Sequence, residues 1–167
     1  LCNRFRGTLD TWDPLFLNEL AKKFKVVIFD YPQVGYSGGT FPNDITGLSN
    51  IVVDLTKDLG FKNIVLAGWS FGGFVAQTVA LNHPGLVSKL VLNGKNHTGD
   101  NQIHLVAIFL EKALIPVNSL EDEHVLFFEP ESEFSVATSK ASHDRIYANI
   151  DVSKIPSTQD EFNRYFI

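Results

Sequence analysis

The stretch from Asn63 to Ala76 places the strongest constraint on the fold of this chain. It begins with an apolar run rich in β-branched residues, passes through Gly-Trp-Ser-Phe-Gly-Gly and continues into helix-forming residues. This order predicts a strand, a sharp turn and a helix, with Ser70 at the turn. A serine in such a turn stands clear of its neighbours, where a base can take the proton from its hydroxyl.

Glycines stand on both sides of Ser70. We expect an unfavourable backbone conformation at this serine, and the strand and helix can pass close together only if Gly68 and Gly72 carry no side chain. The sequence Gly-Trp-Ser-Phe-Gly resembles the nucleophile elbow of the α/β-hydrolase superfamily. A tight turn with an idle serine is the alternative. A phosphate-binding loop is disfavoured, because neither a Gly-Lys-Ser/Thr ending nor G-x-G-x-x-G spacing is present.

The resemblance implies roles for three adjacent residues. Ser70 would be the catalytic nucleophile, and Trp69 beside it would contact the substrate. The backbone N–H of Phe71 would donate to the negative oxygen that develops when Ser70 attacks a carbonyl.

A second oxyanion donor is implied near the start of the chain. In many α/β-hydrolases a His-Gly pair follows an early strand, and the next residue lends its backbone N–H. Counting back from Trp12 places Asn3-Arg4 at the pair and Phe5 at the donor position. The chain therefore departs from the family pattern here. Phe5 is alternatively a plain core aromatic, and both interpretations can hold because the donor is main chain.

Strands and helices alternate along residues 1–101. The patterns predict helices over 13–24, 45–59 and 71–82 and strands over 25–30, 63–69 and 89–94. Asp10 or Thr11 would be the N-cap of the first helix, and Gly60 would end the second helix. This alternation of strands and helices predicts an α/β fold with a doubly wound parallel sheet, here a partial α/β-hydrolase core.

Residues 102–167 read as helices without further strands. The patterns indicate helices over 102–114, 119–128 and 131–149 and one near Ser157, whose N-cap and third residues would be Ser157 and Asp160. This segment resembles the helical cap of many α/β-hydrolases. Its aromatic residues are candidates for lining a substrate pocket, although packing of cap on core is the alternative for each of Phe109, Phe127, Phe128 and Phe134.

Two titratable residues are expected to be structural. Asp30 begins a loop that resembles the family's Asp-x-x-G-x-G-x-S loop, with Gly35 and Ser37 matching, and we expect loop N–H groups to satisfy its buried carboxylate. His83 precedes Pro-Gly and is expected at the C-terminus of a helix, where a cation is favourable.

The base and acid of a serine triad are not identified. In the family they follow the serine, after strands beyond the cap. His97 is the least implausible base and Asp100 a possible neighbour, among the histidines His83, His97, His104, His124 and His143. We expect the chain to be an internal piece of a longer protein and, by itself, close to inactive.

The composition limits the kinds of molecule that the protein is expected to bind. The formal charge of −5 provides no basic stripe for nucleic acid, and no apolar run reaches the ~20 residues of a membrane span. Cys2 is the only cysteine, which favours a reducing, cytoplasmic location. No cluster has metal-ligand spacing, so no metal is expected, and no cofactor is implied. A small-molecule substrate, neutral or apolar, fits best.

The function implied by the resemblance is hydrolysis of an ester, lactone or similar carbonyl compound through an acyl-enzyme on Ser70. Serine at the elbow argues against the epoxide hydrolase and haloalkane dehalogenase branches, which carry aspartate there. Two alternatives stay open: a cofactor-free lyase or perhydrolase that uses the same serine, and a non-catalytic pseudoenzyme that binds a small ligand.

Overall fold

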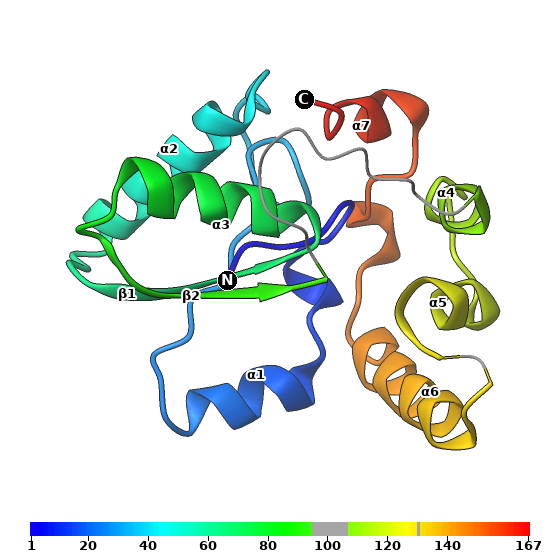
Figure 1. Cartoon of the computed structure of the whole chain (residues 1–167). Coiled ribbons are helices and arrows are strands. Elements are labelled where there is room, and N and C mark those ends of the chain that lie inside the picture. Colours follow the sequence, from blue (N-terminus) through cyan, green and yellow to red (C-terminus); the bar gives the residue numbers. More distant parts are fainter. Residues whose placement is uncertain (95–106, 130) are drawn as a thin grey trace.

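The computed structural model describes residues 1–94, 107–129 and 131–167. Figure 1 shows α2 and α3 on one side of the strands, α1 on the other, and the later helices beyond the carboxyl end of β2. The arrangement is an α/β layer followed by helices, as the sequence predicts. The elements are η1 (Leu9–Thr11), α1 (Pro14–Ala21), α2 (Ile45–Asp58), β1 (Ile64–Trp69), α3 (Phe71–Asn82), β2 (Val87–Asn93), α4 (Ala107–Ala113), α5 (Leu120–Phe127), α6 (Glu133–Tyr147), η2 (Val152–Lys154) and α7 (Gln159–Asn163).

The strands β1 and β2 are parallel and are joined by α3, which is the connection expected for two parallel neighbours. The N-terminal segment lies along the other edge of β1, where Cys2 forms a parallel bridge with Gly68. The N–H of Cys2 donates to the carbonyl of Ala67 at 2.8 Å, and the N–H of Trp69 donates back to Cys2 at 3.1 Å. The start of the chain is thereby fixed beside the strand that leads to Ser70.

The predicted strand over residues 25–30 is wrong, because these residues form no strand in the structure. One hydrogen bond, from the N-terminal amine of Leu1 to the carbonyl of Val27, ties them to the neighbouring segment. An apolar pattern is not sufficient for a strand, and residues 25–30 form no backbone ladder with another described segment. The last strand begins at Val87, two residues earlier than the predicted start at Lys89.

The first helix is shorter than predicted, and its N-cap is Asp13, not Asp10 or Thr11. None of its side chains is buried, and Phe16 and Leu20 border an apolar cavity of about 570 Å³ that residues of α2 and β1 also line. Helix α2 begins after Asp44 and is followed by Gly60 at φ +72°, as its glycine predicts.

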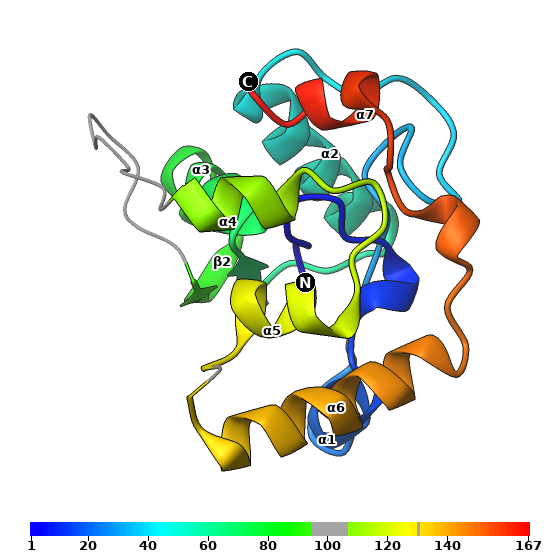
Figure 2. The same ribbon diagram turned by 90° about the vertical axis from the view of Figure 1, so that its right-hand side faces the viewer.

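The helices after residue 106 follow the predicted pattern with shorter bounds. Helix α7 begins later than predicted, with Thr158 instead of Ser157 as its N-cap and Glu161 completing the capping box. The predicted boundary between residues 101 and 102, and the start of the helix over 102–114, lie outside the described residues. Figure 2 shows α4 and α5 in front of β2, and α6 running alongside α1.

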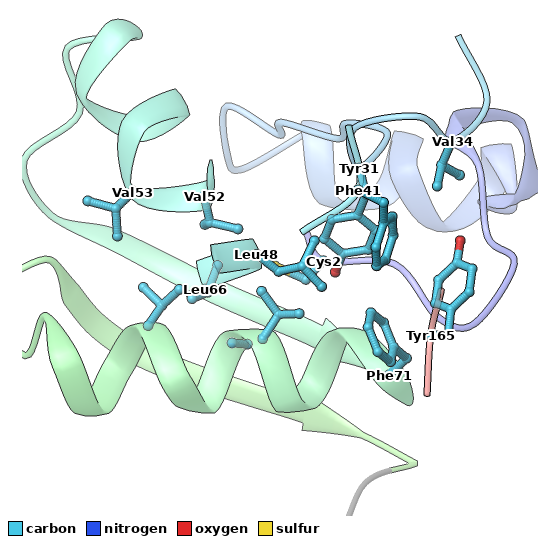
Figure 3. Packing of buried hydrophobic residues seen from close by; sticks show 13 residues of the cluster. Cys2, Tyr31, Val34, Phe41, Leu48, Val52, Val53, Leu66, Phe71 and Tyr165 are labelled. Carbon is cyan, nitrogen blue, oxygen red and sulfur yellow. The ribbon is translucent and has the colours of Figure 1, made fainter. Parts of the chain in front are cut away.

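The hydrophobic core lies between α2, β1 and α3 (Figure 3). Leu48 from α2, Leu66 from β1 and Val75 from α3 are at most 3% exposed. Each such side chain contributes about 1.5–3 kcal/mol through burial. Tyr165, which follows α7, belongs to the same cluster and packs edge-on against Phe71 with ring centroids 5.0 Å apart. The end of the chain therefore packs directly onto the start of α3.

Arg6 ties the N-terminal loop to the helical segment. Its side chain is buried, and its guanidinium donates to backbone carbonyls from two separate connections. The Nε atom donates to Pro156 at 2.7 Å, Nη1 to Ala113 at 3.0 Å and Ile115 at 2.6 Å, and Nη2 to Pro116 at 2.6 Å. The backbone of Arg6 has φ +61°, an unusual value for a residue with a side chain. The charged hydrogen bonds compensate for this strain.

A second tie joins α6 to the start of α1. The guanidinium of Arg145 donates to both carboxylate oxygens of Asp13, at 2.9 Å and 2.6 Å, and the hydroxyl of Ser142 donates to one of them at 2.7 Å. The hydrogen bonds from Arg145 are the largest cause that lowers the pKa of Asp13, to about 2. The same carboxylate caps α1 by accepting from the N–H of Leu15.

Replacing Arg6 by Met should lower the free energy of unfolding by about 3 kcal/mol, because several buried carbonyls lose a charged donor. Arg164→Met is the matched control, since that guanidinium donates at the surface to the carbonyl of Gln33. Arg164→Met should lower the free energy of unfolding by less than about 0.5 kcal/mol. Urea unfolding followed by circular dichroism measures both changes. Equal losses for the two variants would contradict the role of Arg6.

Asp13 should make stability depend on acid pH. Its pKa lies below the ordinary value of 3.8 in the folded state, so its charged form stabilises the fold above about pH 4, and this contribution disappears as the pH falls toward 2. The melting temperature should therefore drop less between pH 5 and pH 2.5 in Asp13→Asn than in the unmodified protein. Asp54→Asn, which removes a surface pair with Lys57, should leave the drop unchanged.

Candidate active site

Ser70 occupies the turn between the end of β1 and the start of α3. Its backbone has φ +50° and ψ −116°, a strained conformation that costs on the order of 1–3 kcal/mol. Its N–H donates to the carbonyl of Asn93 at 2.9 Å, and its carbonyl accepts from the N–H of Gly73 at 2.8 Å. The half-buried hydroxyl makes no hydrogen bond to any described residue. The turn thus presents a free Oγ atom beside the N-terminus of a helix.

Gly68 and Gly72 let the elbow close. A Cβ atom on Gly68 would lie 2.3 Å from the backbone oxygen of Gly72. A Cβ atom on Gly72 would lie 2.3 Å from the backbone oxygen of Cys2. These contacts involve backbone, which has no rotamer to change, so β1, α3 and the N-terminal segment fit together only with glycine at both positions.

The two predicted oxyanion donors lie close to Ser70 in the fold. Phe71 is the first residue of α3, and Phe5 borders the same small cavity as Ser70. Neither backbone N–H donates to another described residue. The ring of Phe5 packs edge-on against Tyr165 with centroids 5.0 Å apart, which confirms the aromatic packing expected of it. Its role as a donor stays a prediction.

Asn3 shapes the loop that carries Phe5. Its side chain is 1% exposed, and its Nδ2 atom donates to the carbonyl of Thr8 at 2.8 Å while its Oδ1 atom accepts from the N–H of Arg4 at 2.8 Å. Gly7 passes directly over this amide, because a Cβ atom there would lie 2.3 Å from Oδ1. Asn3 therefore organises a loop in which sequence reasoning noted only the loss of a family motif.

A cavity of about 30 Å³, the size of one or two water molecules, lies between Ser70 and the helices α4 and α5. Two of the predicted cap phenylalanines border it. Phe128 instead packs against His124, and Phe134 is 81% exposed on α6, so its assignment to a pocket is wrong. The cavity is lined by Arg4, Phe5, Arg6, Ser70, Phe109, Ala113, Asn118, Leu126 and Phe127.

Trp69 does not line this cavity. Its ring packs against Trp12 with centroids 5.7 Å apart and against Phe127 at 5.5 Å. It therefore supports the wall of the cavity through Phe127, and its predicted contact with substrate stays a prediction.

Two arginines at the cavity were missed by sequence reasoning. Arg6 uses its guanidinium on backbone carbonyls, whereas the guanidinium of Arg4 packs against the adjoining rings of Trp69 and Phe127, 5.3 Å and 4.8 Å from their centroids. Burial lowers the pKa of Arg4 to about 10, so the group remains charged at neutral pH. Arginine is almost never buried without a partner, so two arginines in an apolar loop indicate that each charge needs a partner.

Asp30 is structural, as predicted. Its buried carboxylate accepts from the N–H groups of Leu9 at 2.7 Å and Tyr36 at 3.0 Å. Gly35 has φ +57°, and a Cβ atom there would meet this carboxylate at 2.3 Å. Asp30 therefore holds the loop together and is not available to a triad.

No described histidine is hydrogen-bonded to Ser70. His83 caps the C-terminus of α3, as predicted. The ring of His124 packs on Phe128, and Nδ1 of His143 lies 2.8 Å from a carboxylate oxygen of Glu123. The candidates His97 and Asp100 lie outside the described residues, as does His104.

The described parts of the chain also bear on metal binding and on membrane insertion. They contain no group of three or more His, Cys, Asp or Glu side chains arranged to hold a metal ion. Among the helices of the same parts, none is both long and apolar enough to cross a membrane.

Adding a methyl group at Gly72 should disturb the elbow. Gly72→Ala should cost about 2 kcal/mol, because the new Cβ atom must push the backbone of Cys2 away from α3. Gly85→Ala is the matched control, since nothing lies within 4 Å of its added Cβ atom. Urea unfolding compares the two. A Gly72→Ala variant as stable as Gly85→Ala would mean that the close approach is not required.

Comparison with known proteins agrees with this geometry. A family model described as alpha/beta hydrolase fold matches residues 1–165. Serine hydrolase BPHL of Mus musculus is 34% identical over 110 residues, which cover 59% of this chain and 38% of that protein. Pimeloyl-[acyl-carrier protein] methyl ester esterase of Pseudoalteromonas atlantica is 37% identical over 83 residues, which cover 48% of this chain and 30% of that protein.

Among solved structures, an alpha/beta hydrolase fold protein from Chitinophaga pinensis superposes with a TM-score of 0.78 at 28% identity, covering 96% of this chain and 58% of that one. The chain spans about a third of the length of the curated relatives it matches. Because the family model covers nearly every residue and the structure carries the family's elbow at Ser70, the chain belongs to the α/β-hydrolase fold family.

Proposed function

We propose that the protein carrying this chain is a serine hydrolase that cleaves an ester, lactone or related carbonyl compound through an acyl-enzyme on Ser70. The observation that carries the proposal is the strained turn at Ser70, which leaves the hydroxyl unbonded at the border of a cavity. Strain of this kind persists where the surrounding structure maintains it for function. The relatives named as a serine hydrolase and a methyl ester esterase support the same chemistry.

The chemistry would proceed in two steps. The Oγ atom of Ser70 attacks the carbonyl carbon, while the carbonyl oxygen becomes negative and accepts from the free N–H groups of Phe71 and Phe5. The helix α3 adds the positive end of its dipole at this point. The leaving alcohol departs, and water then releases the acid from Ser70. Both steps require a histidine base and an acid that orients it, and no described histidine is hydrogen-bonded to Ser70.

Small-ligand binding without catalysis is the second candidate. It is favoured by the replacement of the family's His-Gly pair with Asn3-Arg4, and by the absence of a base hydrogen-bonded to Ser70 within the described residues. Binding without turnover of any ester or lactone would support this candidate over the hydrolase.

Removing the hydroxyl should abolish turnover. We expect Ser70→Ala to lower kcat for p-nitrophenyl and lactone substrates at least about a thousand-fold, because the nucleophile is lost while binding remains. The assay uses the protein expressed from its complete reading frame. Ser88→Ala is the matched control, since that exposed hydroxyl only donates to the carbonyl of Ile64. A Ser70→Ala variant with more than a tenth of the activity would overturn the assignment.

A further inference from the structure

Arg4 borders the cavity beside Ser70, and its guanidinium has donors that are not used by the protein's described residues. Its Nη1 atom donates to the carbonyl of Phe5 at 2.9 Å. Its Nε atom is buried and has no acceptor, and Nη2 donates to no described residue. Buried donors in native structures are nearly always satisfied, by protein, water or a ligand. Within the described parts of the chain, an acceptor for the Nε atom of Arg4 is therefore missing.

No described carboxylate neutralises the charge of Arg4. Glu123 raises the pKa of Arg4 through its charge, but it forms no ion pair with it. The carboxylate of Glu123 is instead engaged by Nδ1 of His143 at 2.8 Å and by the hydroxyl of Tyr147 at 3.1 Å. The second arginine at the cavity, Arg6, is already bonded to backbone carbonyls. A partly buried charge without an ion-pair partner is unfavourable, so binding of an anion brought by a ligand would be favourable.

The aromatic rings limit the approach to the guanidinium. The centre of the guanidinium lies 5.3 Å from the Trp69 ring and 4.8 Å from the Phe127 ring, and these rings are 5.5 Å from each other, so both lie on one side of the group. The edge of a guanidinium matches the planar geometry of a carboxylate. The rings also hold the group in one orientation, so that little side-chain entropy is lost when a ligand binds.

We propose that Arg4 forms an anion-binding subsite next to Ser70 and that the substrate carries a carboxylate besides the carbonyl group that is attacked. This inference rests on the proposed function, because only a hydrolase has a substrate in this sense. The anion-binding subsite itself would bind a ligand with or without turnover. It revises the expectation of a neutral or apolar substrate. A purely structural role, in which Arg4 only joins Trp69 to Phe127 by cation–π contacts, is the competing account.

Turnover of isosteric charged and neutral substrates tests whether Arg4 forms an anion-binding subsite. The monomethyl esters of malonate, succinate and glutarate are compared at pH 7.5 with the matching methyl ester amides, which are neutral and have the same leaving group. For at least one chain length, kcat/KM for the acid should exceed that for the amide at least about tenfold, the effect of one charge-assisted hydrogen bond. Arg4→Gln should bring this ratio to one or below. Lys22→Gln removes an equal charge from the exposed side of α1 and should leave the ratio unchanged.

Binding separates the subsite from the chemistry. In Ser70→Ala protein, isothermal titration with the same esters should show the acid binding at least about tenfold more tightly than the amide, and Arg4→Gln should remove the difference. If no ester is hydrolysed but the difference in binding is present, the proposed function fails and the subsite stands.

Equal binding of acid and amide at all three chain lengths would overturn the subsite, whatever the turnover. The same conclusion would follow if Arg4→Gln folded and kept the preference for the acid, because Arg4 would then be structural. Arg4→Lys covers the case in which Arg4→Gln does not fold, since it keeps the charge and should keep an acid-to-amide ratio above one.

Discussion

The close approach of β1, α3 and the N-terminal segment at Ser70 is the constraint on which the rest of the structure depends. Gly68 and Gly72 leave no room for a side chain between these three pieces of backbone, and the strain at Ser70 is maintained by hydrogen bonds to Asn93 and Gly73. The same contact brings the loop after Cys2 over the start of α3. One packing requirement thus exposes the hydroxyl and places two free N–H groups near it.

Charged hydrogen bonds then fix the helical segment over this elbow. Arg6 reaches carbonyls on both sides of α5 and α6, and Arg145 holds α6 against the cap of α1 through Asp13. Tyr165 adds an apolar contact with Phe71. Because these ties meet the loop that carries Phe5, movement of the helices would be coupled to the shape of the candidate oxyanion hole. Arg4 also borders the cavity, and its guanidinium donates to a single described carbonyl, that of Phe5.

The sequence predicts the elbow well because its information is local: the β-branched run, the glycines and the helix lie within one short segment. Asp30 and His83 are predictable for the same reason. The strand over 25–30 is not, because a strand also needs a paired neighbour, and these residues form no backbone ladder with another described segment. Neither the carbonyl contacts of Arg6 nor the ring contacts of Arg4 are predictable, since their partners are distant along the chain: Ala113 for Arg6, and Trp69 and Phe127 for Arg4.

The central claim is that Ser70 is an activated nucleophile, and covalent labelling tests it most directly. The protein expressed from its complete reading frame is treated with a fluorophosphonate probe, digested and mapped by mass spectrometry. The account predicts one labelled peptide, modified at Ser70, and no label after Ser70→Ala. A folded protein that stays unlabelled, or a label that survives the substitution, would contradict it.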